Sequence, residues 1–323
     1  MPAHDADWRR RDQPLLSGLT TAEEWCQVQL YSPAVVRARG GYRMWYAGCS
    51  DRTREGVMHL GLAESEDGVE FEPHPDNPVL CADDLPWATV WQTPHVHHDG
   101  GRYRMWFVGI DREREDRQRL GYAESADGVE WDVHPEPLYH SARGPCVHRT
   151  DDGYVMWANS APGPGGPDAE HSLSPIVQFV YRFTSPNGID WTRDPEPAVT
   201  TSGRVRSLVY PEVVETGEGY AMFYGSHLHG DCFEIHCATS ADGREWTRHH
   251  DAAAFPATRD ENDFDGRYTS TPCVLVGDDR ARMYYSARDW GNLYGAGDGT
   301  VRHDAQGIYR HIGLAEADSE ELV

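Results

Sequence analysis

The stretch "GGYRMWYAG", Gly40 to Gly48, decides the fold, because it returns as "GGRYRMWFVG" from Gly100 to Gly109. A proline precedes each copy by the same distance: Pro33 stands 11 residues before Met44. The offset of 11 recurs in four further pairs, Pro94 and Met105, Pro145 and Met156, Pro211 and Met222, and Pro272 and Met283. Successive units are 61, 51, 66 and 61 residues apart, a spacing typical of blade-type repeats.

Each unit is expected to form four antiparallel strands. A first strand such as "SPAVV" meets a second such as "YRMWYAG", and a third such as "LGLAES" follows. An Asp-Gly or Asn-Gly pair then predicts a tight hairpin turn, at Asp67, Asp127, Asn187 and Asp242. An aromatic residue marks the fourth strand, as Phe71, Trp131, Trp191 and Trp246 do.

The fifth unit has no fourth strand of its own, and the N-terminal segment offers one. Trp8 precedes Pro14 by the same six residues that separate Trp131 from Pro137. We therefore predict an all-β protein, a single five-bladed β-propeller domain over residues 1–323, with blades that start near 31, 92, 143, 209 and 270. The segment of about residues 6–16 closes the ring and removes an open sheet edge.

Composition excludes several function classes. The formal charge of −24 argues against nucleic acid and an anionic membrane as partners, because both need a basic surface. Every basic residue is an arginine, so lysine-dependent Schiff-base and P-loop chemistry is excluded as well. Seven cysteines without a CxxC pair, and no apolar run at the start, favour a reducing compartment, and we expect a cytoplasmic protein.

Period-two alternation on the five first strands points two rings of side chains at the central channel. The residues that follow the prolines are Ala34, His95, Cys146, Glu212 and Cys273, and two positions further on stand Val36, His97, His148, Val214 and Leu275. No cofactor is required by this pattern, and that is the leading expectation. A divalent metal in the channel is the alternative, since imidazole and thiolate suit zinc, with the speculative ligands His95, Cys146, His148 and Cys273.

Glu212 is the first candidate for a catalytic group, because a carboxylate on an innermost strand is costly unless it is paired or used. An ion pair with a nearby arginine is the structural alternative. His95 is a second proton carrier, and Asp51 and Asp289, at the ends of second strands, are further carboxylates. The same rim is expected to bind a small hydroxylated or anionic substrate through Ser32, Trp91, Arg143, Arg206, Tyr210, His227, Arg267, Tyr268, Arg288 and Trp290.

Two long loops fall on this rim, Asn159 to Pro175 and Ala287 to Gly307, and both are expected to act as lids. Glu64, Glu124 and Glu316 recur at one position of three blades, which favours a structural role for them.

The chain resembles the five-bladed propeller glycosidase superfamily, which includes glycoside hydrolase families 32, 43, 62, 68 and 130. The resemblance rests on the proline-led first strand, "MWY" on the second and "GLAESEDGVEFEPHPDNPVL" across the third and fourth. It implies a carbohydrate-active enzyme. Family 43 enzymes use three carboxylates, at positions where this chain has Ser32, His95 and Arg143, so the resemblance does not supply the catalytic groups.

Two functions stay open at this stage. The first is a glycoside hydrolase-like enzyme for a small soluble sugar with relocated carboxylates, Glu212 and one of Asp51, Asp111, Asp265 or Asp289. The second is a lyase, isomerase or cyclase for a small polar or anionic metabolite, in which His95 and Glu212 move protons. A sugar-binding module without turnover is a weaker third.

Overall fold

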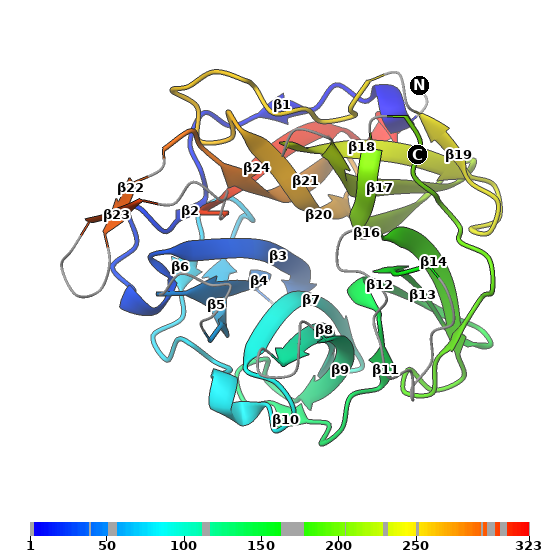
Figure 1. Cartoon of the computed structure of the whole chain (residues 1–323), viewed down its shortest axis with the longest axis horizontal. Coiled ribbons are helices and arrows are strands. Elements are labelled where there is room, and N and C mark those ends of the chain that lie inside the picture. The colour runs from blue at the N-terminus through cyan, green and yellow to red at the C-terminus, as the bar shows by residue number, and fades with distance from the viewer. Residues whose placement is uncertain are drawn as a thin grey trace.

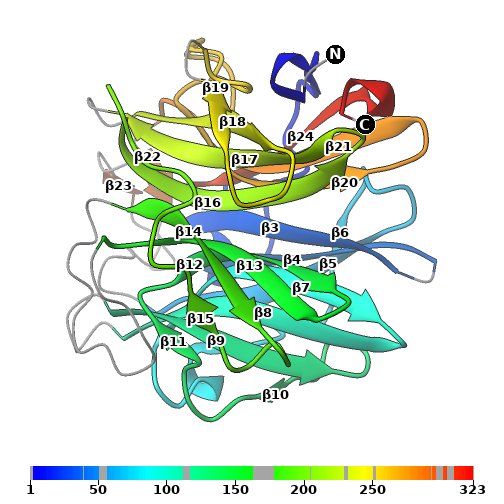
Figure 2. The same ribbon diagram turned by 90° about the vertical axis from the view of Figure 1, so that its right-hand side faces the viewer.

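The computed structural model describes residues 3–38, 40–50, 57–111, 117–162, 178–203, 205–228, 232–249, 252–291, 293–295, 301–303 and 309–322. Five antiparallel sheets surround one centre, which confirms the five-bladed propeller (Figure 1). Seen from the side, the blades cross the whole thickness of the molecule (Figure 2).

The first blade contains β3 (Gln29–Ala38), β4 (Gly41–Cys49), β5 (His59–Ser65) and β6 (Glu72–Pro73). The second contains β7 (Val90–Asp99), β8 (Arg102–Asp111), β9 (Arg117–Ser125) and β10 (Asp132–Val133), with β11 (Tyr139–His140) added beside β9. The third contains β12 (Arg143–Thr150), β13 (Gly153–Ser160), β14 (Phe179–Ser185) and β15 (Thr192–Arg193). The fourth contains β16 (Val205–Thr216), β17 (Gly219–Leu228), β18 (Cys232–Ser240) and β19 (Thr247–His249).

The fifth blade joins the two ends of the chain. Its strands are β20 (Tyr268–Val276), β21 (Arg280–Arg288), β24 (His311–Asp318) and β1 (Arg9–Arg10), with β2 (Leu16–Ser17) also on β24. Arg9 lies opposite Glu316, and the Asp7 amide donates to Glu321 Oε2 at 2.6 Å. The predicted closure of the ring by the N-terminal segment is therefore confirmed.

The recurring proline has a structural reason. Each inner strand, β3, β7, β12, β16 and β20, has a β-bulge between the residue two before the proline and the residue after it. The residue directly before the proline has a positive φ in all five blades, at Ser32, Thr93, Gly144, Tyr210 and Thr271. Proline donates no backbone hydrogen bond, so a bulge on an edge strand accommodates it. The bulge then turns the following side chain toward the channel.

The tryptophan of the "MW" pair links neighbouring blades. Trp45 Nε1 donates to the carbonyl of Gly128 at 3.0 Å, and Trp106 and Trp157 reach Gly188 and Gly243 in the same way at 2.8 and 3.1 Å. In the fifth blade the hydroxyl of Tyr284 donates to Gly68 at 2.8 Å. The fourth blade has Phe223 at this position, where the ring meets Trp8 of the N-terminal segment edge-on.

The glycine acceptors belong to the turns between third and fourth strands, which are wider than the two-residue hairpins expected from sequence. In the first blade β5 ends at Ser65 and β6 begins at Glu72. Ser65 Oγ accepts from the Gly68 amide, and Asp67 Oδ1 accepts from the amides of Val69 and Glu70. The structural role predicted for Glu64, Glu124 and Glu316 fits their ion pairs with Arg43, with Arg102 and Arg104, and with Arg280 and Arg282.

No helix in the described part of the chain is long and apolar enough to cross a membrane.

Candidate functional site

A cavity of about 640 Å³ lies between the five inner strands, which contact one another in ring order. Its upper end is defined here as the end with the bulges, where Ser32, Thr93, Gly144, Tyr210 and Thr271 stand. Its lower end lies near Arg37, Asp99, Arg149 and Glu215. Four of the five residues that follow the prolines line this channel as predicted: Ala34, His95, Glu212 and Cys273.

Four of the five residues that follow the prolines also link one inner strand to the next by a hydrogen bond to its backbone. Cys146 Sγ accepts from the Val213 amide at 3.2 Å, and Glu212 Oε1 accepts from the Val274 amide at 3.0 Å. Cys273 Sγ accepts from the Val35 amide at 3.3 Å, and His95 Nε2 donates to the Val147 carbonyl at 3.1 Å. Each acceptor or donor valine stands two residues after a proline. Ala34, which has no polar side-chain atom, makes no such bond to Val96.

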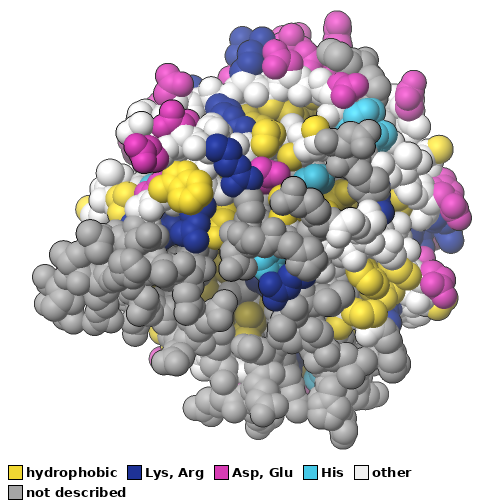
Figure 3. Space-filling view, turned by 45° about the horizontal axis from the view of Figure 1, so that its top comes forward, with side chains coloured by type: hydrophobic (Ala, Val, Ile, Leu, Met, Phe, Trp, Pro, Cys, Tyr) yellow, Lys and Arg dark blue, Asp and Glu magenta, His cyan; other side chains and the backbone are white. Residues whose placement is uncertain are grey.

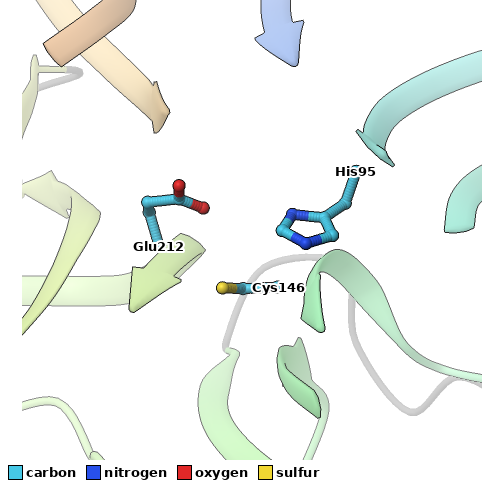
Figure 4. A group of neighbouring side chains, drawn as sticks. All are labelled: His95, Cys146 and Glu212. Carbon is cyan, nitrogen blue, oxygen red and sulfur yellow. The ribbon is translucent and has the colours of Figure 1, made fainter. Parts of the chain in front are cut away.

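Three of these side chains converge. One ligand-type atom each of His95, Cys146 and Glu212 lies within 4.8 Å of the other two (Figure 4). In Figure 4 one ring nitrogen of His95 is turned toward the Glu212 carboxylate, while the thiol of Cys146 lies below both. Cys146 and Glu212 are buried, His95 is half-buried, and His95 and Glu212 border the cavity.

Burial dominates the protonation of this cluster. It raises the pKa of Glu212 to about 7, although bonds from the Val274 amide and Cys146 act in the opposite direction. It lowers the pKa of His95 well below its usual value, and the nearby rings of His97 and His148 lower it further. It also raises the pKa of the Cys146 thiol well above its usual value. Near neutral pH the cluster therefore holds a neutral imidazole, a thiol and a carboxyl that can keep its proton.

Two of the ligands predicted from sequence lie outside this group. His148 Nε2 donates to the Val213 carbonyl at 2.9 Å and its ring packs edge-on against Trp157. Cys273 is held by Val35 as described above and is not among the three convergent residues. Of the four ligands predicted from sequence, His95 and Cys146 belong to this group, and its third member is Glu212, which the sequence predicted as a proton carrier.

Arg143 stands at the upper end of the channel, immediately before Gly144. One of its terminal nitrogens donates to the hydroxyl of Tyr210 and approaches Gln92 Oε1 at 3.4 Å, and its guanidinium lies over the Tyr210 ring at 4.9 Å. Its Nε is buried and has no hydrogen-bond partner. No carboxylate pairs with Arg143 among the described residues, so its charge is balanced only by neutral oxygens and an aromatic face.

Tyrosines surround this arginine. Burial raises the pKa of Tyr309 well above its usual value, with smaller effects from Tyr210, Ser270, Tyr268 and Arg143. Tyr309 also stacks on Tyr31, with ring centroids 5.7 Å apart, and meets Tyr268 edge-on. Arg143 and the Tyr210 hydroxyl thus combine a cation with a phenol, a pair that can bind an oxyanion and sugar hydroxyls.

Asp289 follows β21 on the rim of the fifth blade. Its Oδ2 accepts from His311 Nε2 at 3.1 Å, and its Oδ1 accepts from the Gly291 amide at 2.9 Å. Burial would raise the pKa of Asp289, but the hydrogen bond from His311 and the charges of His311, Arg310 and Arg288 outweigh it and leave the pKa lowered. Asp289 is therefore an ionised carboxylate.

The same rim holds several of the predicted binding residues. Arg267 lies over the rings of Tyr268 and Trp290, at 4.9 and 5.8 Å from their centroids, and Trp290 is 43% exposed. Arg288 is fully buried and donates to the Gly291 carbonyl at 2.6 Å. His227 is half-buried and stacks on Phe233. In Figure 3 acidic side chains lie mostly along the edge of the molecule, and several arginine side chains lie nearer its middle.

Other predicted residues have different surroundings. Trp91 is not available to stack on a sugar, because it is fully buried, packs on Phe107 and donates from Nε1 to the Cys81 carbonyl. Ser32 is buried, and its amide donates to Ser286 Oγ at 2.7 Å. Arg206 is half-buried on β16, at a second bulge of that strand. Asp51 and most of the loop Asn159 to Pro175 lie outside the described residues, as does much of the loop Ala287 to Gly307, where β22 (Leu293–Gly295) and β23 (Val301–His303) pair.

The two candidate carboxylates do not lie at one level of the propeller. Asp289 follows Arg288, which lies opposite Tyr268 on β20, whereas Glu212 Oε1 accepts from the amide of Val274, next to Cys273 on the same strand. Five residues of β20 separate these levels, or about 15 Å of strand. Carboxyl groups that flank a glycosidic bond stand about 5 to 10 Å apart, less than the separation of these two strand levels.

Sequence reasoning missed a buried chain of amides beside Arg143. Asn159 donates from Nδ2 to Gln178, and Gln178 donates from Nε2 to Gln118 at 3.1 Å. Asn159 Oδ1 accepts from the amide of Tyr210 at 3.0 Å, which fixes that residue in its unusual backbone conformation. Asp265, one of the carboxylates considered from sequence, instead pairs with Arg10 and Tyr285 beneath the N-terminal segment.

Two proteins share part of this sequence, and several solved structures share the fold. No family model matches the chain. An uncharacterized protein of Mycobacterium tuberculosis is 34% identical over 145 residues, 41% of this chain and 47% of that protein. A second uncharacterized protein of the same species is 32% identical over 111 residues, 31% of this chain and 32% of that protein. The chain thus matches less than half the length of either relative.

Solved structures match over nearly the whole chain at low identity. A glycoside hydrolase of known structure has a TM-score of 0.71 at 16% identity, and the match covers 97% of this chain and 92% of that protein. A glycosyl hydrolase from Bacteroides ovatus has a TM-score of 0.68 at 16% identity, with 98% of this chain and 95% of that protein covered. The β-1,2-mannobiose phosphorylase of Listeria innocua, in complex with β-1,2-mannobiose, has a TM-score of 0.68 at 12% identity and 98% coverage of both proteins. The chain has the fold of these glycoside hydrolase-like five-bladed propellers.

Proposed function

We propose that the protein is a carbohydrate-active enzyme that binds a small sugar at the upper end of the channel. The substrate carries an oxyanion, or reacts with one, and Arg143 binds it. The fold shared with glycoside hydrolases and a mannobiose phosphorylase supports the substrate class. The site itself supports the oxyanion.

The observation that carries the proposal is the state of Arg143. A half-buried guanidinium normally has a carboxylate partner, because the desolvation of a cation is costly. Arg143 has only Tyr210, Gln92 and an aromatic face, and its Nε is buried without a partner. A ligand phosphate or carboxylate would accept two parallel hydrogen bonds from the guanidinium and supply the missing charge.

Asp289 is the carboxylate that we assign to the reaction. Its lowered pKa keeps it ionised, which suits a proton acceptor or a group that stabilises positive charge on a sugar ring. Glu212 has a pKa raised to about 7, but its level in the channel is separated from that of Asp289 by about 15 Å of strand. We therefore do not assign Glu212 and Asp289 to one glycosidic bond.

A second function, non-hydrolytic chemistry on a small anionic metabolite, is favoured by one observation. The three positions that hold carboxylates in family 43 carry Ser32, His95 and Arg143 here, and the structure shows Ser32 bonded to Ser286 and His95 bonded to a backbone carbonyl. A lyase or isomerase needs one base and an anion-binding group, and Asp289 with Arg143 supplies both.

The test is turnover of a panel of glycosides, oligosaccharides and uronic acid derivatives, each with and without inorganic phosphate. Wild type is compared with Arg143→Gln, Asp289→Asn and the control Arg149→Gln, which removes an exposed arginine at the lower end of the channel. Turnover that needs Arg143 and Asp289 but not Arg149 supports the carbohydrate function, and dependence on phosphate distinguishes transfer to phosphate from hydrolysis. Turnover that is equal in all four proteins would refute the assignment. Absence of any turnover would leave the non-hydrolytic function as the better candidate.

A further inference from the structure

We propose that His95, Cys146 and Glu212 form a binding site for a divalent transition metal of the zinc type inside the channel. The site is built by three inner strands, β7, β12 and β16, and it does not depend on the proposed sugar chemistry. Its donors are one imidazole nitrogen, one sulfur and one carboxylate oxygen within 4.8 Å of one another. Zinc binds these three donor types at about 2.0 to 2.3 Å, so atoms around one ion lie about 3 to 4 Å apart, and small side-chain movements suffice.

Backbone hydrogen bonds orient all three donor side chains, as outer-shell hydrogen bonds orient metal ligands. His95 donates from Nε2 to the Val147 carbonyl at 3.1 Å, which leaves Nδ1 with a free electron pair. In Figure 4 that other ring nitrogen is turned toward Glu212. Cys146 Sγ accepts from the Val213 amide, and Glu212 Oε1 accepts from the Val274 amide. Amide donors of this kind stabilise a thiolate and a carboxylate, the forms that bind a metal.

The charges also match. A thiolate and a carboxylate together carry two negative charges, the neutral imidazole carries none, and a divalent ion neutralises the set. No arginine is paired with Glu212 among the described residues, so the ion pair considered from sequence does not balance this carboxylate. The metal replaces the protons that the Cys146 thiol and the Glu212 carboxyl hold in its absence, as it does at other thiolate and carboxylate sites.

The hydrogen bonds between neighbouring inner strands do not by themselves explain why His95, Cys146 and Glu212 converge. Cys273 makes the same pair of contacts with Val35 and stands outside the group of three. Ala34 contributes no polar atom at the same position, and the ring is closed there all the same. With three protein ligands and a cavity of about 640 Å³ beside them, the fourth position is open to water or to a ligand, as in catalytic rather than structural zinc sites.

The experiment uses cobalt(II) as a spectroscopic probe on the full chain, after chelation under reducing conditions. We expect one equivalent of cobalt to bind with a thiolate-to-cobalt charge-transfer band, and zinc to displace it. Cys146→Ser should abolish the band, and Glu212→Gln should weaken cobalt binding by at least about 100-fold, more than the loss of an outer-shell partner costs. Cys237→Ser, which changes a buried cysteine on β18 outside the channel, is the matched control and should keep the band.

Circular dichroism of each variant separates a lost ligand from a lost fold. If Cys146→Ser does not fold, His95→Gln and Glu212→Gln serve in its place, because both side chains border the cavity. The proposal is overturned if wild type binds no cobalt, if bound cobalt shows no charge-transfer band, or if the band persists in folded Cys146→Ser or is unchanged in folded Glu212→Gln and His95→Gln.

Discussion

The tryptophans that connect the blades allow a quantitative test of the fold, because the carbonyl that accepts from Trp106 has a second indole donor and the one that accepts from Trp157 has none. The carbonyl of Gly188 accepts from two indoles, Trp106 at 2.8 Å and Trp191 at 3.0 Å. The carbonyl of Gly243 accepts from Trp157 at 3.1 Å, and the neighbouring Trp246 has a buried Nε1 without a partner. Replacement of Trp106 by Phe thus leaves its acceptor with one donor, whereas replacement of Trp157 by Phe leaves its acceptor with none.

The expected cost follows from this difference. Both tryptophans are buried, with 1% and 3% exposed, so the loss of apolar contact is similar and cancels in the comparison. Trp106→Phe loses a hydrogen bond worth about 1 kcal/mol, whereas Trp157→Phe also leaves a buried carbonyl unsatisfied, which costs about 1 to 3 kcal/mol. We expect Trp157→Phe to lower the free energy of unfolding by about 1 to 3 kcal/mol more than Trp106→Phe does.

The assay is equilibrium unfolding in urea, followed by far-UV circular dichroism so that the removed indole does not affect the signal. Trp45→Phe is a second reference, because Gly128 also accepts from two indoles, Trp45 and Trp131. If Trp157→Phe is no less stable than Trp106→Phe and Trp45→Phe, the carbonyl at Gly243 does not depend on its tryptophan and the reasoning is wrong.

Three further predictions concern the turns, the channel and the ring closure. Backbone amides lower the pKa of the turn aspartates, so their contribution to stability is present above the unfolded pKa of about 3.9 and is lost as the pH falls through the lower folded pKa. In the third blade Asn187 accepts the same two hydrogen bonds, so we expect a triple variant with asparagine at Asp67, Asp127 and Asp242 to fold. At pH 7 it should have a smaller free energy of unfolding than wild type, and this difference should vanish in acid. A difference that does not depend on pH would refute the prediction. Ala34→Cys should supply the missing bond to Val96 and raise the free energy of unfolding by up to about 1 kcal/mol, and a loss of stability would contradict the repeat in the channel. Trp8→Ala should lower the free energy of unfolding by about 3 to 5 kcal/mol. Trp8→Phe, which removes an indole nitrogen without a partner, should lower it much less. Equal losses would show that packing on Phe223 does not hold the N-terminal segment in place.

The fold could be predicted from the sequence because its determinants are repeated and local. The proline marks a bulge that each blade needs, and the methionine and aromatic residues that follow mark the second strand, so the equal offsets of 11 report the same structure five times. Alternation from each proline then placed His95, Cys146 and Glu212 around the central axis, where they meet. The width of the turns was not predicted, because Asp-Gly also occurs in the longer serine-capped turn found here.

The site was less accessible from sequence, because its contacts join distant segments. Alternation indicates which side chains face the channel but not which of them meet, and so His148 and Cys273 were included as ligands in place of Glu212. The pairing of Asp289 with His311 depends on the register of β21 and β24, which no local pattern shows. Trp91 was misassigned because an aromatic residue beside a predicted rim can equally face the core, as it does here.

The central claim is that Arg143 binds an oxyanion at the upper end of the channel. The most direct test is calorimetric titration of wild type, Arg143→Gln and Arg149→Gln with inorganic phosphate, galacturonate and a neutral sugar as ligands. We expect wild type and Arg149→Gln to bind at least one of the two anions, and Arg143→Gln to bind that anion at least about 10-fold more weakly, the loss of one charge-assisted contact. Equal affinity of Arg143→Gln and wild type for every anion that binds, or no anion binding by wild type, would contradict the claim.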